Sequence, residues 1–406
     1  MSGHHEGVDL TTVAMLRAPA GTELLAALPR YDEAAVLSLG ARLRERYPAE
    51  LVAAALTQAR LRERAARRLG PIAYELLWTP DAAQQATRRS VADWRAGRMR
   101  AGGVRRVLDL GAGAGGDALA LAAVGIDVIA VERDPVVAAV LTANAAVAGA
   151  GRIRVVQADV AETAVVEPLL ADCDAVFADP ARRIAGRRVL DPAGWSPSLR
   201  TIGTYAARVR CAAAKVGPGI DHDLLPDGVT AEWVSEHGDV LECALWWGGL
   251  RGAAPRSATV LGSSPDATRT LTGTGARAEV RPAGRFLHEP DGAVIRAGLV
   301  AEVAVQLDGG LLDPSIAYIS TDADVTSPWT TRYAVTDVLP FSVKALRALL
   351  RARGVGRLVI KKRGTAVTPE QLRPQLRLAG PREATVVLTR VGRRPYALLV
   401  EPLPSR

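Results

Sequence analysis

The fold of this chain is decided by residues 107–117, which read Val107-Leu108-Asp109-Leu110-Gly111-Ala112-Gly113-Ala114-Gly115-Gly116-Asp117. This stretch joins a short apolar strand to a glycine-rich turn, and an apolar helix is expected over residues 118–124. A second apolar strand, residues 128–131, follows and ends on the acid Glu132. Glycines let the backbone approach a ligand closely, and an acid at this place accepts hydrogen bonds from a ribose. The sequence therefore predicts an α/β unit that binds a nucleoside cofactor.

The spacing of the glycines separates two classes of cofactor. Gly111, Gly113 and Gly115 are spaced G-x-G-x-G, whereas a dinucleotide fingerprint is spaced G-x-G-x-x-G and usually has an apolar residue before its first glycine. Here Asp109 stands two residues before that glycine, and a carboxylate there would repel a pyrophosphate at the helix N-terminus. It would attract the sulfonium and ammonium of S-adenosylmethionine (SAM). The motif favours SAM, and the alternative is an NAD-binding or nucleotide-free Rossmann domain with an atypical turn.

The order of the acids resembles that of the class I SAM-dependent methyltransferases. Their pattern is strand–D-x-G-x-G-x-G–helix, then an acid ending the second strand and an acid after the third; here Glu132 and Asp159 take the last two places. The resemblance implies an α/β Rossmann-like sheet, mostly parallel with an antiparallel last strand. It also implies that Asp109 lies near the methionine end, that Glu132 holds the ribose hydroxyls and that Asp159 faces the adenine amine. The expected cofactor-binding residues are Asp109, Gly111, Gly113, Gly115, Glu132 and Asp159.

The fourth predicted strand, residues 173–178, ends in Asp179-Pro180-Ala181-Arg182-Arg183. This ending resembles the D/N-P-P-Y/F motif of methyltransferases that act on exocyclic amines of bases. In that motif the acid or amide accepts hydrogen bonds from the amine, the proline carbonyl assists, and the aromatic ring stacks on the flipped base. Ala181 and Arg182 depart from the pattern, although a guanidinium plane can also stack on a base. The alternative is a strand-to-loop turn with a solvated basic tip.

A second polar group, Asp221-His222-Asp223, follows the predicted fifth strand over residues 212–216. Active sites of open α/β sheets lie at the carboxyl ends of the strands. His222 is therefore a candidate for relaying a proton or positioning the substrate. A polar loop is the alternative, and because no second cluster of ligands is visible, no metal site is predicted. The candidate catalytic residues are Asp179, Pro180, Arg182 and His222.

Charge is distributed unevenly along the 406 residues, whose net charge is +8. Residues 41–106 hold 15 basic and 6 acidic residues, residues 341–406 hold 15 and 3, and residues 107–340 hold 19 and 29. Basic flanks around an acidic core suggest a polyanionic partner. Only four of the 51 basic residues are lysine, which looks like GC-rich codon bias, but such bias does not explain the reversal of sign. The expected RNA contacts are Arg60, Arg64, Arg67, Arg68, Lys361, Lys362, Arg363, Arg393 and Arg394.

The chain divides into four expected regions. Residues 1–100 are helical, with Thr79 capping a helix that runs through Gln84 to Arg98, and residues 101–265 form the SAM-binding domain. Residues 266–335 connect it to a small basic α/β module over residues 336–406, and the fold of this connection is left open. In the module, Ser342 caps a helix and Thr368-Pro369-Glu370-Gln371 forms a capping box. The module resembles the THUMP-like domain that follows the SAM domain in a group of bacterial methyltransferases.

Three widely separated cysteines, no apolar signal core and no apolar run of about 18 residues together predict a cytoplasmic protein without a membrane segment. Its expected function is methylation of an exocyclic amine of a base in rRNA or tRNA. The alternatives are methylation of a small molecule or a protein, and a non-catalytic SAM-fold scaffold that binds RNA. The oligomeric state and the nucleotide that is modified are left open.

Overall fold

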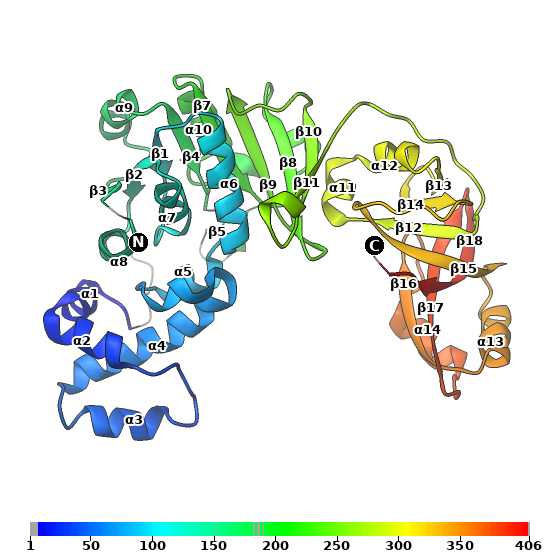
Figure 1. The fold of residues 1–406 in the computed structure, drawn as a ribbon, viewed down its shortest axis with the longest axis horizontal. Helices are drawn as coiled ribbons and strands as arrows, with labels where there is room; N and C mark the ends of the chain where they lie inside the picture. Colours follow the sequence, from blue (N-terminus) through cyan, green and yellow to red (C-terminus); the bar gives the residue numbers. More distant parts are fainter. Residues whose placement is uncertain (1–6, 150, 182, 185–186, 190, 405–406) are drawn as a thin grey trace. The chain divides into compact units, whose positions relative to one another are not determined.

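A computed structural model describes residues 7–149, 151–181, 183–184, 187–189 and 191–404 (Figure 1). The side chains of residues 182–188 are not described. The chain forms two compact units. The first comprises Met1–Val216, Ile220–Val229 and Ala244–Arg251, and the second comprises Gly217–Gly219, Thr230–Cys243 and Gly252–Arg406.

The first unit begins with a helical region, as the sequence predicts. Its elements are α1 (Leu10–Arg17), α2 (Pro19–Ala27), α3 (Val36–Leu43), α4 (Ala49–Leu69), η1 (Gly70–Tyr74), α5 (Pro80–Gln85) and α6 (Arg89–Ala101). The apolar faces of α1, α2 and α4 form one core with Val140 and Ala143. Buried Asn144 ties this region to the glycine-rich turn, because its amide group bonds to the backbone of Leu77 and to the carbonyl of Ala114.

The single helix expected after Thr79 is two helices. Thr79 caps α5 as predicted, but the chain leaves the helix at Ala86 and α6 starts only at Arg89. In the break, the Thr87 hydroxyl donates to Asp117 and the Ala86 carbonyl accepts from Arg68. These distant partners hold residues 86–88 in an extended conformation, which is why helical periodicity alone does not reveal the break.

The sheet of the first unit has the parallel order β3-β2-β1-β4-β7, with strands β1 (Arg106–Leu110), β2 (Asp127–Glu132), β3 (Ile153–Gln157), β4 (Ala175–Ala178) and β7 (Cys211–Val216). Its helices are α7 (Gly116–Ala123), α8 (Pro135–Ala148), α9 (Thr163–Ala171) and α10 (Leu199–Ala206). Helices α6, α7 and α8 cover one face. The connections through α9 and α10 run in the opposite direction along the sheet, so right-handed crossovers place these two helices on the other face. All the carboxyl ends of these strands meet at one edge.

Strand β9 (Asp239–Gly248) follows β8 (Thr230–Glu236) through the turn His237-Gly238, whose two residues have φ values of 51° and 85°. Two consecutive positive φ values are typical of the turn that joins antiparallel hairpin strands. Within the first unit, residues 244–248 of this strand lie beside β7. The predicted antiparallel hairpin is therefore present. In the second unit, β10 (Arg256–Leu261) runs parallel to β8, and β11 (Arg269–Thr272) runs antiparallel to β10.

The second unit also contains a seven-stranded sheet with the order β13-β14-β12-β15-β18-β17-β16. Its strands are β12 (Phe286–Pro290), β13 (Gly310–Asp313), β14 (Ile316–Thr321), β15 (Thr330–Pro340), β16 (Val355–Lys362), β17 (Arg382–Val391) and β18 (Arg394–Pro402). The connection left open by the sequence, residues 266–335, thus supplies β12, β13, β14 and the start of β15. Helices α11 (Gly292–Ala297) and α12 (Val300–Gln306) lie between these strands in the chain.

Two further helices, α13 (Val343–Ala352) and α14 (Pro369–Leu376), share a core with β16, β17 and β18. Both predicted caps are confirmed. Ser342 Oγ accepts from the Ala345 amide, and Thr368 and Gln371 form the reciprocal capping box. In the described part of the chain, no helix is both long enough and apolar enough to span a bilayer.

Candidate active site at the carboxyl ends of the parallel strands

The glycine-rich turn follows β1, and its three glycines serve two different purposes. All three have positive φ values, at 84° for Gly111, 57° for Gly113 and 93° for Gly115, a region that side chains disfavour. A Cβ atom on Gly111 or Gly113 would meet nothing within 4 Å, whereas one on Gly115 would lie 2.5 Å from Leu141 Cδ1. The first two glycines therefore leave open space above the turn, and the third allows α7 to pack against α8.

Asp109, on β1 just before the turn, is fully buried, with 1% of its surface exposed. Neither carboxylate oxygen has a hydrogen-bond partner within the described residues. Burial raises the pKa of Asp109 well above its usual value, and the nearby carboxylates of Asp117, Asp179 and Glu132 raise it further. A buried, unpartnered acid among other acids is costly in the free protein and is suited to a positively charged ligand.

Glu132, at the end of β2, braces the turn. Its Oε2 accepts from the Gly113 amide at 3.0 Å, and its Oε1 accepts from the Asp134 amide at 2.9 Å. Because each carboxylate oxygen carries two lone pairs, both can still accept from a hydroxyl. Asp159, after β3, accepts from the Ala161 amide at 2.9 Å and lies 3.7 Å from the Arg133 guanidinium.

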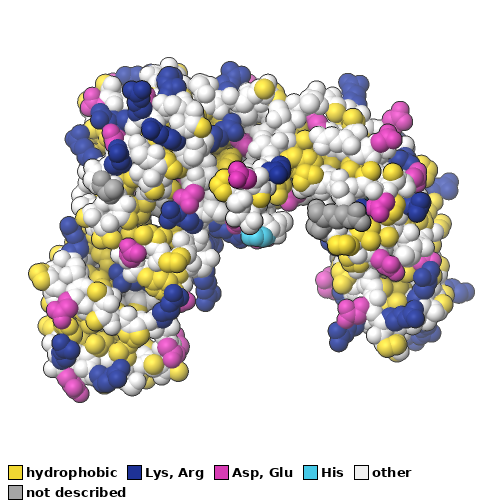
Figure 2. Space-filling model, viewed as in Figure 1, with side chains coloured by type: hydrophobic (Ala, Val, Ile, Leu, Met, Phe, Trp, Pro, Cys, Tyr) yellow, Lys and Arg dark blue, Asp and Glu magenta, His cyan; other side chains and the backbone are white. Residues whose placement is uncertain are grey.

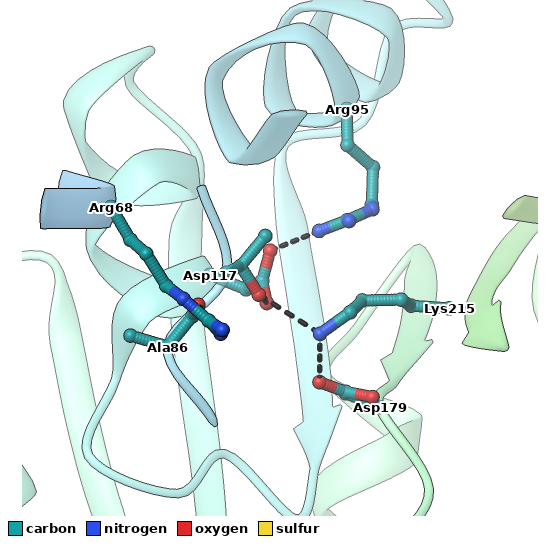
Figure 3. A network of polar contacts seen from close by, with 7 residues as sticks. Arg68, Ala86, Arg95, Asp117, Asp179 and Lys215 are labelled. Carbon is teal, nitrogen blue, oxygen red and sulfur yellow. Dashed lines mark hydrogen bonds and ion pairs between the residues drawn. The ribbon is translucent and has the colours of Figure 1, made fainter. Parts of the chain in front are cut away.

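Asp179 follows β4 and belongs to a polar network that the sequence does not reveal (Figure 3). Lys215 of β7 forms an ion pair with Asp179 Oδ2, and the same ammonium donates to Thr87 Oγ1 at 2.9 Å. Thr87 in turn donates to Asp117 Oδ2 at 3.1 Å, and Asp117 is ion-paired with Arg95. Figure 3 shows Arg95 and Lys215 directed toward the two acids from different elements.

Sequence reasoning missed Lys215, Thr87, Asp117 and Arg95 as members of the site. One signal was available, since Lys215 is a rare lysine in an arginine-rich chain and interrupts the otherwise apolar strand Cys211–Val216. Arg95 gave no such signal, because it lies among other arginines of α6. It is only 2% exposed, and its guanidinium lies 5.1 Å from the centre of the Phe177 ring.

The other predicted catalytic residues are Pro180, Arg182 and His222. Pro180 is buried, and the next residue, Ala181, exchanges backbone hydrogen bonds with Ser196. Arg182 lies outside the described residues. His222 is half-buried in the short helix η3 (His222–Leu224), whose cap is Asp221. Within the described residues, no group of three His, Cys, Asp or Glu side chains could hold a metal ion.

The basic residues singled out for RNA contact fall into two groups. Most are exposed: Arg60, Arg64, Arg67, Arg68, Lys362, Arg393 and Arg394. Lys361 and Arg363 are half-buried instead, and both contact Glu289, at 2.6 Å and 3.4 Å. Figure 2 shows dark-blue Lys and Arg side chains over the N-terminal helices and, separately, over the C-terminal module, with magenta acids among them.

Family models match three parts of the chain. Residues 104–182, from just before β1 to just beyond Asp179, match the RNA cap guanine-N2 methyltransferase family. Residues 330–402 match the THUMP domain-like family, and residues 9–65 match a domain of unknown function. The chain thus carries a THUMP-like domain near its C-terminus, as its sequence predicts.

Whole-chain comparisons agree with these matches. Two curated relatives from Mycobacterium tuberculosis, strains CDC 1551 and H37Rv, are each described as an uncharacterized S-adenosylmethionine-dependent methyltransferase. Each is 36% identical over 341 residues, which cover 82% of this chain and 91% of the relative. The crystal structure of a putative methyltransferase from Porphyromonas gingivalis W83 has the same fold. It has a TM-score of 0.74 at 20% identity and covers 93% of this chain and 100% of that one. With SAM as its cofactor, this chain belongs to the S-adenosylmethionine-dependent methyltransferases.

Proposed function

We propose that the enzyme transfers the methyl group of SAM to an exocyclic amine of a base in rRNA or tRNA. The observation that carries this proposal is the position of Asp179. It lies at the carboxyl end of β4, next to the strand that leads into the glycine-rich turn. Lys215 holds its Oδ2, and within the described residues no hydrogen bond reaches its Oδ1. A carboxylate oxygen of this kind can accept an N–H of an amine.

The residues around the turn fit SAM better than a dinucleotide. Open space above Gly111 and Gly113 gives the ligand access to the backbone. The buried carboxylate of Asp109 lies among three further acids and would attract the sulfonium and ammonium, whereas it would repel a pyrophosphate. Glu132 would accept from the ribose hydroxyls, and Asp159 would accept from the adenine amine.

SAM supplies an electrophilic methyl group on sulfonium sulfur. The amine nitrogen would give its lone pair to the new C–N bond as the C–S bond breaks with its electron pair going to sulfur, and the methylated nitrogen would then release its proton to solvent water. Asp179 would accept a hydrogen bond from the amine and direct the nitrogen lone pair at the methyl carbon, with the Pro180 carbonyl as second acceptor. Because transfer needs an in-line approach, positioning supplies much of the rate enhancement. His222 takes no part in this step.

Three observations support RNA as the substrate. The matched guanine-N2 family is named for an exocyclic amine of RNA, and it spans the residues that carry Asp109 and Asp179. The chain also carries a THUMP-like domain. The exposed arginines of α4 and the exposed Lys362, Arg393 and Arg394 would bind phosphates, whereas Lys361 and Arg363 would act chiefly as partners of Glu289.

The experiment compares wild type with Asp179→Ala and Asp179→Asn, using SAM labelled in its methyl group and total RNA from a strain that lacks the enzyme. We expect Asp179→Ala to bind SAM normally and to transfer no label. We expect Asp179→Asn to keep part of the activity, because an amide oxygen also accepts from an amine. The exposed neighbour Asp172 provides the matched control, Asp172→Ala, which should behave as wild type. Normal transfer by Asp179→Ala would remove Asp179 from the mechanism, and a wild type that binds SAM but transfers no label to RNA would refute the substrate.

A further inference from the structure

Lys215 is joined to Asp179 by the topology of the sheet. Strands β4 and β7 are parallel neighbours, with Ala178 opposite Ala214, so the next residues on each strand meet at the same edge. The Lys215 side chain is 13% exposed, and its ammonium contacts Asp179 and Thr87 at once. An exposed ion pair would fix little, but this lysine is bound on two sides and mostly buried.

The contacts behind Lys215 keep it in place. Thr87 accepts from the ammonium and donates a hydrogen bond to Asp117, which is ion-paired with buried Arg95. Arg95 lies over the ring of Phe177, two residues before Asp179 on β4. This series of contacts therefore begins at Asp179, just after β4, and returns to Phe177 on β4. It passes through Thr87, in the break between α5 and α6.

This arrangement restricts the Asp179 carboxylate. Without a partner, the carboxylate could turn about its last torsion and offer either oxygen to the substrate. With Oδ2 held by Lys215, this rotation is restricted and Oδ1 faces the substrate. We propose that Lys215 is a positioning residue that orients Asp179 toward the target amine, and that Thr87 and Asp117 hold Lys215 for this purpose. The inference rests on the proposed function, and it assigns residues 86–88 of the helical region to the active site.

The kinetic test uses four variants and one control. Lys215→Met keeps the length of the side chain and removes the charge, Lys215→Arg keeps the charge, and Thr87→Val and Thr87→Ser remove and restore the hydroxyl. The control, Lys344→Met, changes an exposed lysine of α13. Measured quantities are the dissociation constant for SAM, the melting temperature, and kcat and KM for methyl transfer to RNA.

We expect Lys215→Met to lower kcat about 100-fold, the effect of misplacing a reacting group by about 1 Å. KM for RNA, the affinity for SAM and the melting temperature should stay close to wild type. Thr87→Val should lower kcat about tenfold, because it removes one hydrogen bond to a charged group. Lys215→Arg and Thr87→Ser should each keep a higher kcat than Lys215→Met and Thr87→Val. Unchanged or higher kcat in Lys215→Met and Thr87→Val would overturn the inference, since it would mean that Lys215 merely fills the amine site until substrate displaces it.

A second readout does not depend on activity. The chain has only four lysines, Lys215, Lys344, Lys361 and Lys362, so protein labelled with ¹⁵N at lysine Nζ gives few ammonium signals by NMR. The signal lost in Lys215→Met should be protected from solvent exchange and should move in Asp179→Asn and Thr87→Val. A Lys215 signal whose chemical shift is the same in wild type, Asp179→Asn and Thr87→Val would refute the contacts of Lys215 with Asp179 and Thr87. A wild type with this signal but no transfer to RNA would instead refute the proposed function, and the inference with it.

Discussion

Substitution of Gly111 by alanine distinguishes two roles of this glycine, relief of backbone strain in the turn and access of SAM to the backbone. Gly111 has a φ of 84°, and a Cβ atom there would meet nothing within 4 Å. The folded protein should therefore lose only the free energy of holding an alanine at positive φ, about 1–2 kcal/mol. For a unit of this size, that free energy corresponds to a fall in melting temperature of about 2–8 °C. If the open space is where SAM approaches the backbone, the same methyl group should weaken SAM binding at least tenfold, or by about 1.4 kcal/mol.

The chain offers a matched control in Gly125. Its φ is 83°, and a Cβ atom there would also meet nothing within 4 Å, but it precedes β2 and lies at the amino ends of the strands. Gly125→Ala should cost as much stability as Gly111→Ala and leave the affinity for SAM unchanged. Calorimetric titration with SAM and thermal unfolding of both variants provide the measurements. Equal affinity for SAM in the two variants would refute the assignment of the turn as the cofactor site.

Buried Asp109, buried His288 and the exposed arginines of α4 can each be tested by substitution. Because the pKa of Asp109 is raised in the folded protein, stability falls as pH rises from the usual aspartate range through the folded pKa. Asp109→Asn should therefore melt at a higher temperature than wild type at pH 8 and should bind SAM more weakly. A melting temperature below that of wild type would contradict this. Burial lowers the pKa of His288 from 6.5 to about 4, so the free energy of unfolding should fall by about 3 kcal/mol as pH falls from 6.5 to 4. Denaturant titrations of His288→Gln should lack this pH dependence. A pH profile of His288→Gln identical to that of wild type would disprove the role of His288. The exposed arginines of α4, Arg60, Arg64, Arg67 and Arg68, can be replaced with glutamine. This should reduce the slope of log affinity for RNA against log salt concentration by about one unit per lost phosphate contact. An unaltered slope would exclude α4 from the RNA interface.

The parts of this molecule that sequence predicts well are those specified by neighbouring residues. The strand–glycine turn–helix unit, the acid that ends β2, and the caps at Ser342 and Thr368 each depend on a few consecutive positions.

The parts that sequence did not reveal depend on long-range neighbours. Lys215 and Asp179 are 36 residues apart and meet only because β4 and β7 are adjacent. Thr87 reaches Lys215 across 128 residues, and this contact accompanies the break between α5 and α6. Residues 266–335 form short strands whose order in the sheet differs from their order in the chain, since β12 pairs with β14 and β15 and not with β13, so neither periodicity nor turn residues could indicate their fold.

Nucleoside mass spectrometry shows whether the enzyme methylates an exocyclic base amine in RNA. RNA from a strain without the enzyme is incubated with SAM and either wild type or Asp179→Ala, then digested to nucleosides. We expect one nucleoside to gain a methyl group on its exocyclic nitrogen with wild type and not with the variant. A methyl group on a ribose 2′-oxygen or a base carbon, or RNA left unmethylated by an enzyme that binds SAM, would contradict it.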